Sequence, residues 1–149
     1  MGDMTRKARA VVLQALYEVD ASGHDPQDVL IRLAREARLS EKALSAAQEI
    51  VLGVGNYAKD LDAIIQERAP SFPVGQLAVV DRNILRIAIW EVLFDNKVPP
   101  KVAINEAVEL AKNFGAANSY RFVNGVMGSI MATKENNGTS LQATSKGRG

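Results

Sequence analysis

The sequence predicts an all-α protein with a single hydrophobic core, and three observations lead to that fold class. Apolar residues recur at steps of three and four along most of the chain. Prolines, glycines and capping residues divide this pattern into segments of helix length. The chain has 149 residues, of which 47% are hydrophobic, and this is enough for one domain with one core.

The first expected helix, residues 5–19, has two distinct faces. The core stripe comprises Ala8, Val12, Ala15, Leu16 and Val19. The opposite side aligns Arg6, Arg9, Leu13 and Tyr17. Two interpretations of that side stay open. Either it is a binding face, or Leu13 and Tyr17 pack against a second layer while the arginines are solvated.

Capping residues mark where the next two helices begin. Asp25, followed by a proline, is typical of a helix start because its carboxylate can accept a hydrogen bond from an early amide. Ser40 caps a third helix, which we expect to run without a break to about residue 68. Residues 69–76 carry two prolines and a glycine, and they separate an N-terminal half, 5–68, from a C-terminal half, 77–132.

Two glycines lie inside the third helix, where glycine is unfavourable. Gly53 and Gly55 each cost roughly 1 kcal/mol relative to alanine at such a position. Close approach of another helix, which a residue without a side chain permits, is the expected compensation. We therefore expect another element of the core to cross the third helix at these glycines.

A central helix is predicted over residues 77–94, because this stretch is apolar on nearly every side. Glu91 projects onto the same arc as Ile84 and Ile87, which are expected to be buried. A buried carboxylate needs hydrogen-bond donors. We expect the unbonded amides that open the next helix, near Val102, to supply them. The alternative is that Glu91 reaches solvent.

The stretch from Val98 to Met127 predicts a helical hairpin, because two prolines stop the preceding helix and a regular apolar pattern follows. Gly115 stands where a left-handed residue usually closes a helix. Asn118 can cap the second helix of the hairpin. Residues 133–149 contain almost no large apolar side chain, so we expect them to form a disordered tail.

The sequence lacks the residue patterns of catalysis and metal binding, so we expect no enzyme activity, metal, cofactor or small-molecule substrate. It has no cysteine, no glycine-rich phosphate loop, and a single histidine, His24, without a partner at ligand spacing. No apolar run has the character of a signal peptide or a membrane span, and we expect a cytoplasmic protein. The net charge is +1, so binding to nucleic acid requires a local patch of cations.

The stretch VPPKVAINEAVELAKNFGAANSYRFVNGVM closely resembles the signature region of the NusB family of bacterial transcription antitermination factors. The resemblance continues through LAVVDRNILRIAIWEVL and ARAVVLQALYEVD, so it covers about residues 6–131. It implies a compact bundle of about seven helices in two helical subdomains, as a single RNA-binding domain over residues 1–132. It also implies binding to boxA RNA of ribosomal and other transcripts together with NusE, a small-subunit ribosomal protein. The pair then joins the RNA polymerase elongation complex through other Nus factors.

The resemblance assigns residues of this chain to two surfaces. The RNA-binding residues that it implies are Arg6, Lys7, Arg9, Lys112, Asn118, Tyr120 and Phe122. The residues that it implies for the NusE surface are Tyr17, Asp81, Arg82 and Arg86. The first set suits RNA, because cations neutralise phosphates and aromatic side chains stack on unpaired bases. For Phe122, a place in the core is the alternative.

Three positions depart from the family pattern. The basic start is thin, because Lys7 and Ala8 stand among positions that many relatives fill with arginine. Asn118 stands where an acid is common, which removes a charge that would repel phosphate. Gly128 replaces a usual aspartate and costs roughly 1 kcal/mol in the last helix. The first departure lowers the expected RNA affinity, and the second raises it.

Two other functions stay open at this point. One is an RNA-binding module similar to the N-terminal domain of rRNA cytosine methyltransferases, although no second domain is expected after residue 132. The other is a helical dimerisation module, which would associate tightly with itself and have no affinity for RNA.

Overall fold

A computed structural model describes residues 4–136 of the chain. The described residues form seven α-helices: α1 (Arg6–Ser22), α2 (Pro26–Glu36), α3 (Glu41–Asn56), α4 (Ala58–Arg68), α5 (Val79–Ile89), α6 (Pro100–Phe114) and α7 (Ser119–Asn136). A short 3-10 turn at Val74–Gln76 precedes α5, and a π-helical segment at Trp90–Asp95 extends it. The predicted all-α fold class is confirmed. Within the described part, no helix combines the length and the hydropathy needed to cross a membrane.

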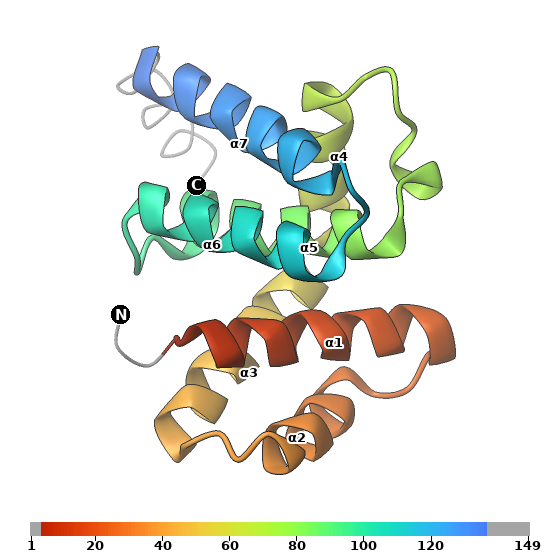
Figure 1. The fold of residues 1–149 in the computed structure, drawn as a ribbon, viewed down its shortest axis with the longest axis vertical. Coiled ribbons are helices and arrows are strands. Elements are labelled where there is room, and N and C mark those ends of the chain that lie inside the picture. Colours follow the sequence, from red (N-terminus) through yellow and green to blue (C-terminus); the bar gives the residue numbers. More distant parts are fainter. Residues whose placement is uncertain (1–3, 137–149) are drawn as a thin grey trace.

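The helices fall into two groups in space (Figure 1). Helices α1, α2 and α3 pack together, and α4, α6 and α7 surround α5. The sequence places the boundary between the halves at residues 69–76, after α4. In space α4 lies with the C-terminal helices, because it packs against α5 and α7. The division between the groups therefore falls at Tyr57, between α3 and α4.

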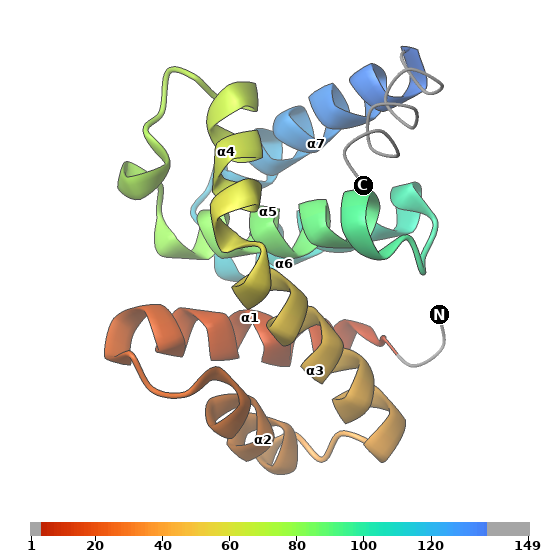
Figure 2. The same cartoon turned by 180° about the vertical axis from the view of Figure 1, so that it is seen from behind.

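The predicted unbroken helix over residues 40–68 is wrong. The chain leaves helical geometry at Tyr57, where φ is −112° and ψ is 17°. Two glycines precede the break and weaken the last turn of α3. Figure 2 shows the result from behind, with α3 and α4 crossing the molecule from one group to the other.

Only one of the two glycines in α3 permits a close approach. A Cβ atom on Gly53 would lie 2.1 Å from Cε2 of Trp90, so the indole fills the space that a side chain would need. Nothing lies within 4 Å of the corresponding position on Gly55. The expected close approach is therefore confirmed for Gly53 and wrong for Gly55.

Local capping signals are confirmed at the starts of α2 and α3. The side chains of Asp25 and Ser40 each accept a hydrogen bond from the amide three residues further on, at 3.0 and 3.1 Å. Gly115 differs from the expectation, since its φ of −91° and ψ of −175° are extended rather than left-handed. It is needed for space, because a Cβ there would lie 2.5 Å from Cβ of Ser119 and 2.8 Å from the carbonyl oxygen of Ala111.

The start and the end of α7 also differ from the prediction. The hydroxyl of Ser119 accepts a hydrogen bond from the amide of Ala116 at 2.8 Å and closes the turn after α6. Across residues 4–136, Asn118 makes no side-chain hydrogen bond of this kind. Helix α7 continues to Asn136, beyond the predicted end at residue 132. The rest of the predicted disordered tail, residues 137–149, lies outside the described residues.

The core lies along α5 and between the two groups. The largest fully buried apolar side chains include Leu30, Leu61, Ile65, Ile84, Leu85, Ile87, Ile89 and Met127. Four of these eight belong to α5, which has neighbours in both groups. The prediction of a central helix buried on nearly every side is confirmed.

Candidate nucleic-acid interface

A chain of charged and aromatic side chains runs along α6 and joins the start of α1 to the start of α7. We call it the α6 strip. Its members are Arg6, Glu106, Glu109, Lys112, Tyr120 and Arg121. In Figure 1, α6 lies between α1 and α7, which explains why residues so far apart in the sequence meet. The strip brings together three of the predicted RNA-binding residues, Arg6, Lys112 and Tyr120.

At the α1 end of the strip, Arg6 is held by two carboxylates of α6. Its Nε and Nη2 donate to the two carboxylate oxygens of Glu106, at 3.2 and 2.9 Å. Its Nη1 lies 3.9 Å from Oε1 of Glu109. The other oxygen of Glu109 lies 3.4 Å from Nζ of Lys112, one turn along α6. One carboxylate thus links two predicted RNA-binding cations.

At the α7 end, two cations lie close to one aromatic ring. Nζ of Lys112 is 5.6 Å from the ring centroid of Tyr120, and Cζ of Arg121 is 5.5 Å from it. Nε of Arg121 also donates a hydrogen bond to the hydroxyl of Tyr120 at 3.0 Å. Arg121 is not among the predicted residues, because the sequence shows only that it points away from the apolar face of its helix. Its place beside a tyrosine at a helix start is the signal that could have found it.

The strip is exposed and strongly paired. The side chain of Arg6 is 62% exposed, and that of Glu106 is 16% exposed. The hydrogen bond from Arg6 lowers the pKa of Glu106, and the same hydrogen bond raises the pKa of Arg6. Glu106 is therefore ionised at neutral pH, and the strip presents three cations together with two carboxylates.

Arg9, which the sequence places on the RNA face, is buried. Its side chain is 4% exposed, and its Nη2 lies 2.6 Å from Oε2 of Glu91, whose side chain is 3% exposed. Its Nη1 donates to the carbonyl oxygen of Met4 at 2.9 Å. Helix α1 packs against α2 and α3 on one side and against α5 on another. The face of α1 that carries Arg9 is therefore covered by other helices. Arg9 joins two helical groups and does not reach the surface.

The same contact corrects the prediction for Glu91. Its carboxylate accepts hydrogen bonds from Nε and Nη2 of Arg9, at 3.3 and 2.6 Å. The amides of Val102 and Ala103 instead donate to the carbonyl oxygen of Pro99. Glu91 is buried as expected, but its donors come from α1 rather than from the start of α6. The apolar residues on either side of Arg9 in the sequence were the signal that could have predicted its burial and its pairing with Glu91.

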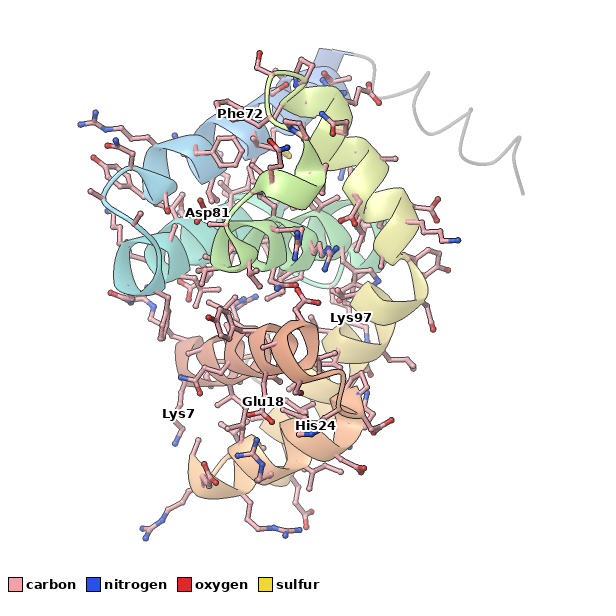
Figure 3. The ribbon with its side chains drawn as sticks, turned by 90° about the vertical axis from the view of Figure 1, so that its right-hand side faces the viewer. Lys7, Glu18, His24, Phe72, Asp81 and Lys97 are labelled. Carbon is pink, nitrogen blue, oxygen red and sulfur yellow. The ribbon has the colours of Figure 1, made fainter. Side chains whose placement is uncertain are left out.

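The remaining predicted RNA-binding residues lie apart from the ion-paired strip. Figure 3 shows Lys7 on α1, with its side chain pointing into the solvent. Asn118 is exposed in the turn before α7. Phe122 is half-buried and packs edge-on against Phe72, with ring centroids 5.7 Å apart and planes at 74°. Figure 3 shows Phe72 beside α7, in the loop that precedes α5. Phe122 also packs against the buried core cluster, and this supports the core alternative.

The residues assigned to the NusE surface divide into two places. Tyr17 is 49% exposed and lines an open groove that also includes Leu13, Val80 and Phe114. Leu13 itself is buried. The face of α1 opposite its core stripe is therefore covered at Leu13 and exposed one turn later, at Tyr17. Most of the side chains that line the groove are apolar, with Gln14 and Glu18 as exceptions, and they include Phe114, the last residue of α6.

The two arginines of α5 are engaged in contacts within the chain. Arg86 makes a bidentate pair with Asp62 of α4, with both distances 2.7 Å, and this hydrogen bonding raises the pKa of Arg86. Arg82 lies 3.4 Å from Asp20 of α1. The side-chain amide of Asn83, the residue after Arg82, donates from Nδ2 to Asp20 at 2.9 Å. These contacts tie α1, α4 and α5 together, and the two arginine side chains are only 16% and 14% exposed.

Asp81 and His24 take no part in these ion pairs. Oδ1 of Asp81 is buried and has no hydrogen-bond partner among the described residues. His24 is exposed, with Nδ1 3.8 Å from a carboxylate oxygen of Glu18. In the described part of the chain, no group of three or more histidine, aspartate or glutamate side chains is placed to hold a metal ion.

Comparison with known proteins decides the family. The model of the NusB family matches residues 6–132. The chain belongs to the NusB family. The transcription antitermination protein NusB of Roseiflexus sp. (strain RS-1) is 46% identical over 134 residues, which are 89% of this chain and 94% of that protein. The NusB of Dehalococcoides mccartyi (strain CBDB1) is 50% identical over 125 residues, 84% of this chain and 87% of that protein.

Solved NusB structures have the same fold. T. maritima NusB superposes with a TM-score of 0.79 at 33% identity, covering 85% of this chain and 91% of the other. A chain in the structure of antitermination factors NusB and NusE in complex with double-stranded RNA superposes with a TM-score of 0.77 at 25% identity. That match covers 84% of this chain and 93% of the other. The NusB match includes the whole α6 strip and both arginine–glutamate pairs of α1.

Proposed function

We propose that this NusB-family chain is a non-enzymatic transcription antitermination factor. It binds boxA RNA together with NusE and joins the RNA polymerase elongation complex in the cytoplasm. The α6 strip carries the proposal, because it gathers cations and an aromatic ring on an exposed face. The names of the relatives, transcription antitermination proteins, support the regulatory role. The solved complex of a NusB relative with NusE and double-stranded RNA supports the choice of NusE and RNA as partners.

The chemistry of the strip suits a single strand of RNA. Arg6, Lys112 and Arg121 can neutralise consecutive phosphates along α6. Tyr120 can stack on an unpaired base, and the exposed amide of Asn118 can donate to and accept from base edges next to it. A strand that follows the strip would run from α1 toward the turn between α6 and α7.

NusE adds what this chain lacks. The net charge of +1 and the two carboxylates in the strip predict weak binding to RNA by the chain alone. We place NusE over the groove that contains Tyr17 and Phe114, because exposed aromatic side chains beside a hollow are typical anchors of protein interfaces. Phe114 lies two residues after Lys112 on α6, so NusE in that groove would contact the same helix that carries the strip. Arg82 and Arg86 then hold α5 in place beneath this surface.

A binding titration tests the proposed function. Labelled boxA-like RNA and a scrambled RNA of equal length are titrated with the protein, with and without NusE, at several salt concentrations. We expect weak binding alone, a marked gain with NusE, and tighter binding to the boxA-like sequence. If boxA-like and scrambled RNA bind equally in both conditions, the proposed function is wrong.

Two substitutions locate the RNA in the same assay. Tyr120→Ala should weaken binding without changing its salt dependence, because stacking releases no counterions, whereas Tyr120→Phe should retain most of the affinity. Equal losses in both variants would mean that the hydroxyl, bonded to Arg121, matters rather than the ring.

A further inference from the structure

Two acidic residues of α6 occupy the atoms that the strip would use to hold RNA. Glu106 takes the Nε and Nη2 edge of Arg6, with distances of 3.2 and 2.9 Å. Glu109 faces the remaining amino group of Arg6 at 3.9 Å, and it also lies 3.4 Å from Lys112. The two carboxylates therefore face two of the three cations in the strip.

A phosphate cannot bind Arg6 in this arrangement unless hydrogen bonds between Arg6 and Glu106 are lost. Two N–H groups on one edge of a guanidinium group bind the two oxygens of a carboxylate. The same two N–H groups bind a phosphate bidentately. A phosphate at Arg6 must therefore displace Glu106 or accept a poorer geometry. A carboxylate that stays nearby repels the phosphate. The lowered pKa of Glu106 means that its negative charge persists at neutral pH.

We propose that Glu106 and Glu109 limit the RNA affinity of this chain by competing with RNA phosphates for Arg6 and Lys112. The inference rests on the proposed function. It assigns to the two glutamates a role mainly in binding strength, since the side chain of Arg6 is 62% exposed and an exposed pair contributes little to stability. RNA binds fully only where its phosphates, helped by charge from a partner, replace the intramolecular acids.

The competition changes how binding responds to salt. In the parent chain, RNA displaces a carboxylate from Arg6, so few counterions are released at that residue. The displaced carboxylate stays beside the phosphate and keeps a cation there, whereas without its charge the contact between Arg6 and the phosphate releases the cation condensed on the RNA. Removing the charge of Glu106 should therefore steepen the dependence of log affinity on log salt by up to about 0.7 for single-stranded RNA. A purely structural role for Glu106 would not move this slope.

Glu106→Gln is the test, with Glu67→Gln as the matched control. Both variants raise the net charge by one. Glu67 belongs to α4, which lies in front of α5 and α6 in Figure 2, and its side chain is 71% exposed. We expect Glu106→Gln to bind RNA about three- to fivefold more tightly than the parent, with the steeper slope. Glu109→Gln should give a smaller gain, and Glu67→Gln should stay within about twofold.

The Arg6→Ala background separates competition from general repulsion. If Glu106 acts through Arg6, Glu106→Gln gains much less affinity in that background. An equal gain in both backgrounds, or equal behaviour of Glu106→Gln and Glu67→Gln, overturns the inference. Binding to scrambled RNA is measured alongside, so that loss of sequence discrimination counts against the proposed function alone. Thermal unfolding of each variant shows that the fold is retained.

Discussion

Arg6 and Arg9 lie one turn apart on α1, and each pairs with a glutamate of the C-terminal group, yet their surroundings differ. The side chains of Arg9 and Glu91 are 4% and 3% exposed, whereas that of Arg6 is 62% exposed. A buried charge cannot lose its partner without a large penalty in a medium of low dielectric constant. An exposed charge changes its partner at little cost. The same pair of groups therefore supports the fold at Arg9, and at Arg6 it leaves the cation able to exchange its partner.

The largest effect is expected where the buried pair is broken. Arg9→Ala leaves the buried carboxyl group of Glu91 without its hydrogen-bond donors, and it should lower the free energy of unfolding by about 3–5 kcal/mol. Urea denaturation followed by circular dichroism measures the change. The double variant Arg9→Met with Glu91→Leu removes both charges and should recover most of the loss. A loss in Arg9→Ala no larger than that of a surface substitution would show that the pair does not hold the groups together.

The two glycines of α3 give a second comparison between a buried and an exposed residue of the same type. Gly53→Ala forces a methyl group into the indole of Trp90 and should cost about 1–3 kcal/mol of unfolding free energy. Gly55→Ala meets open space and should stabilise the helix by up to about 1 kcal/mol. Denaturation midpoints of the two variants give the comparison. If both substitutions changed the unfolding free energy in the same direction, the close packing of Trp90 on Gly53 would be contradicted.

Arg6→Ala should weaken RNA binding and leave the stability of the fold nearly unchanged. We expect a denaturation midpoint close to that of the parent, because the arginine is largely solvated. RNA binding should weaken by a similar factor for boxA-like and scrambled sequences, because a phosphate contact carries no sequence information. A destabilisation comparable to that of Arg9→Ala would mean that the two pairs play the same structural role.

The smallest effect concerns acid pH. Arg6 lowers the pKa of Glu106 from its ordinary 4.5, so the unfolded chain binds a proton at Glu106 at higher pH than the folded chain does. The stability from this pair is complete above the ordinary pKa and is lost as pH falls through the folded pKa. The difference in Tm between the parent and Glu106→Gln should therefore shrink below about pH 4.5. A difference that grows on acidification would contradict the lowered pKa.

Local signals in the sequence were sufficient for the starts of α2 and α3 and for the fold class. Asp25 and Ser40 cap helices because the contact spans only three residues, so neighbouring sequence determines it. The periodic pattern likewise marks the central helix. These predictions depend on contacts within one helix turn or one helix face.

Predictions that depended on distant contacts were less successful. The burial of Arg9 follows from packing of α1 on both sides, and its partner Glu91 is 82 positions away in the sequence. The break at Tyr57 follows from the course of α4 toward α5 and α7, which no periodic pattern indicates. Arg6, Lys112 and Tyr120 were assigned to one surface through resemblance to the NusB family, and the contacts that join them are made across three helices.

The position of Trp90 gives the molecule a spectroscopic reporter. It is the single tryptophan of the chain, it is 8% exposed, and its ring lies on Gly53 at the seam between the two groups of helices. Any separation of the groups admits water to the indole, which shifts its fluorescence emission to longer wavelengths and quenches it. The intrinsic fluorescence of the unlabelled protein therefore measures whether the two halves stay docked when RNA or a partner binds.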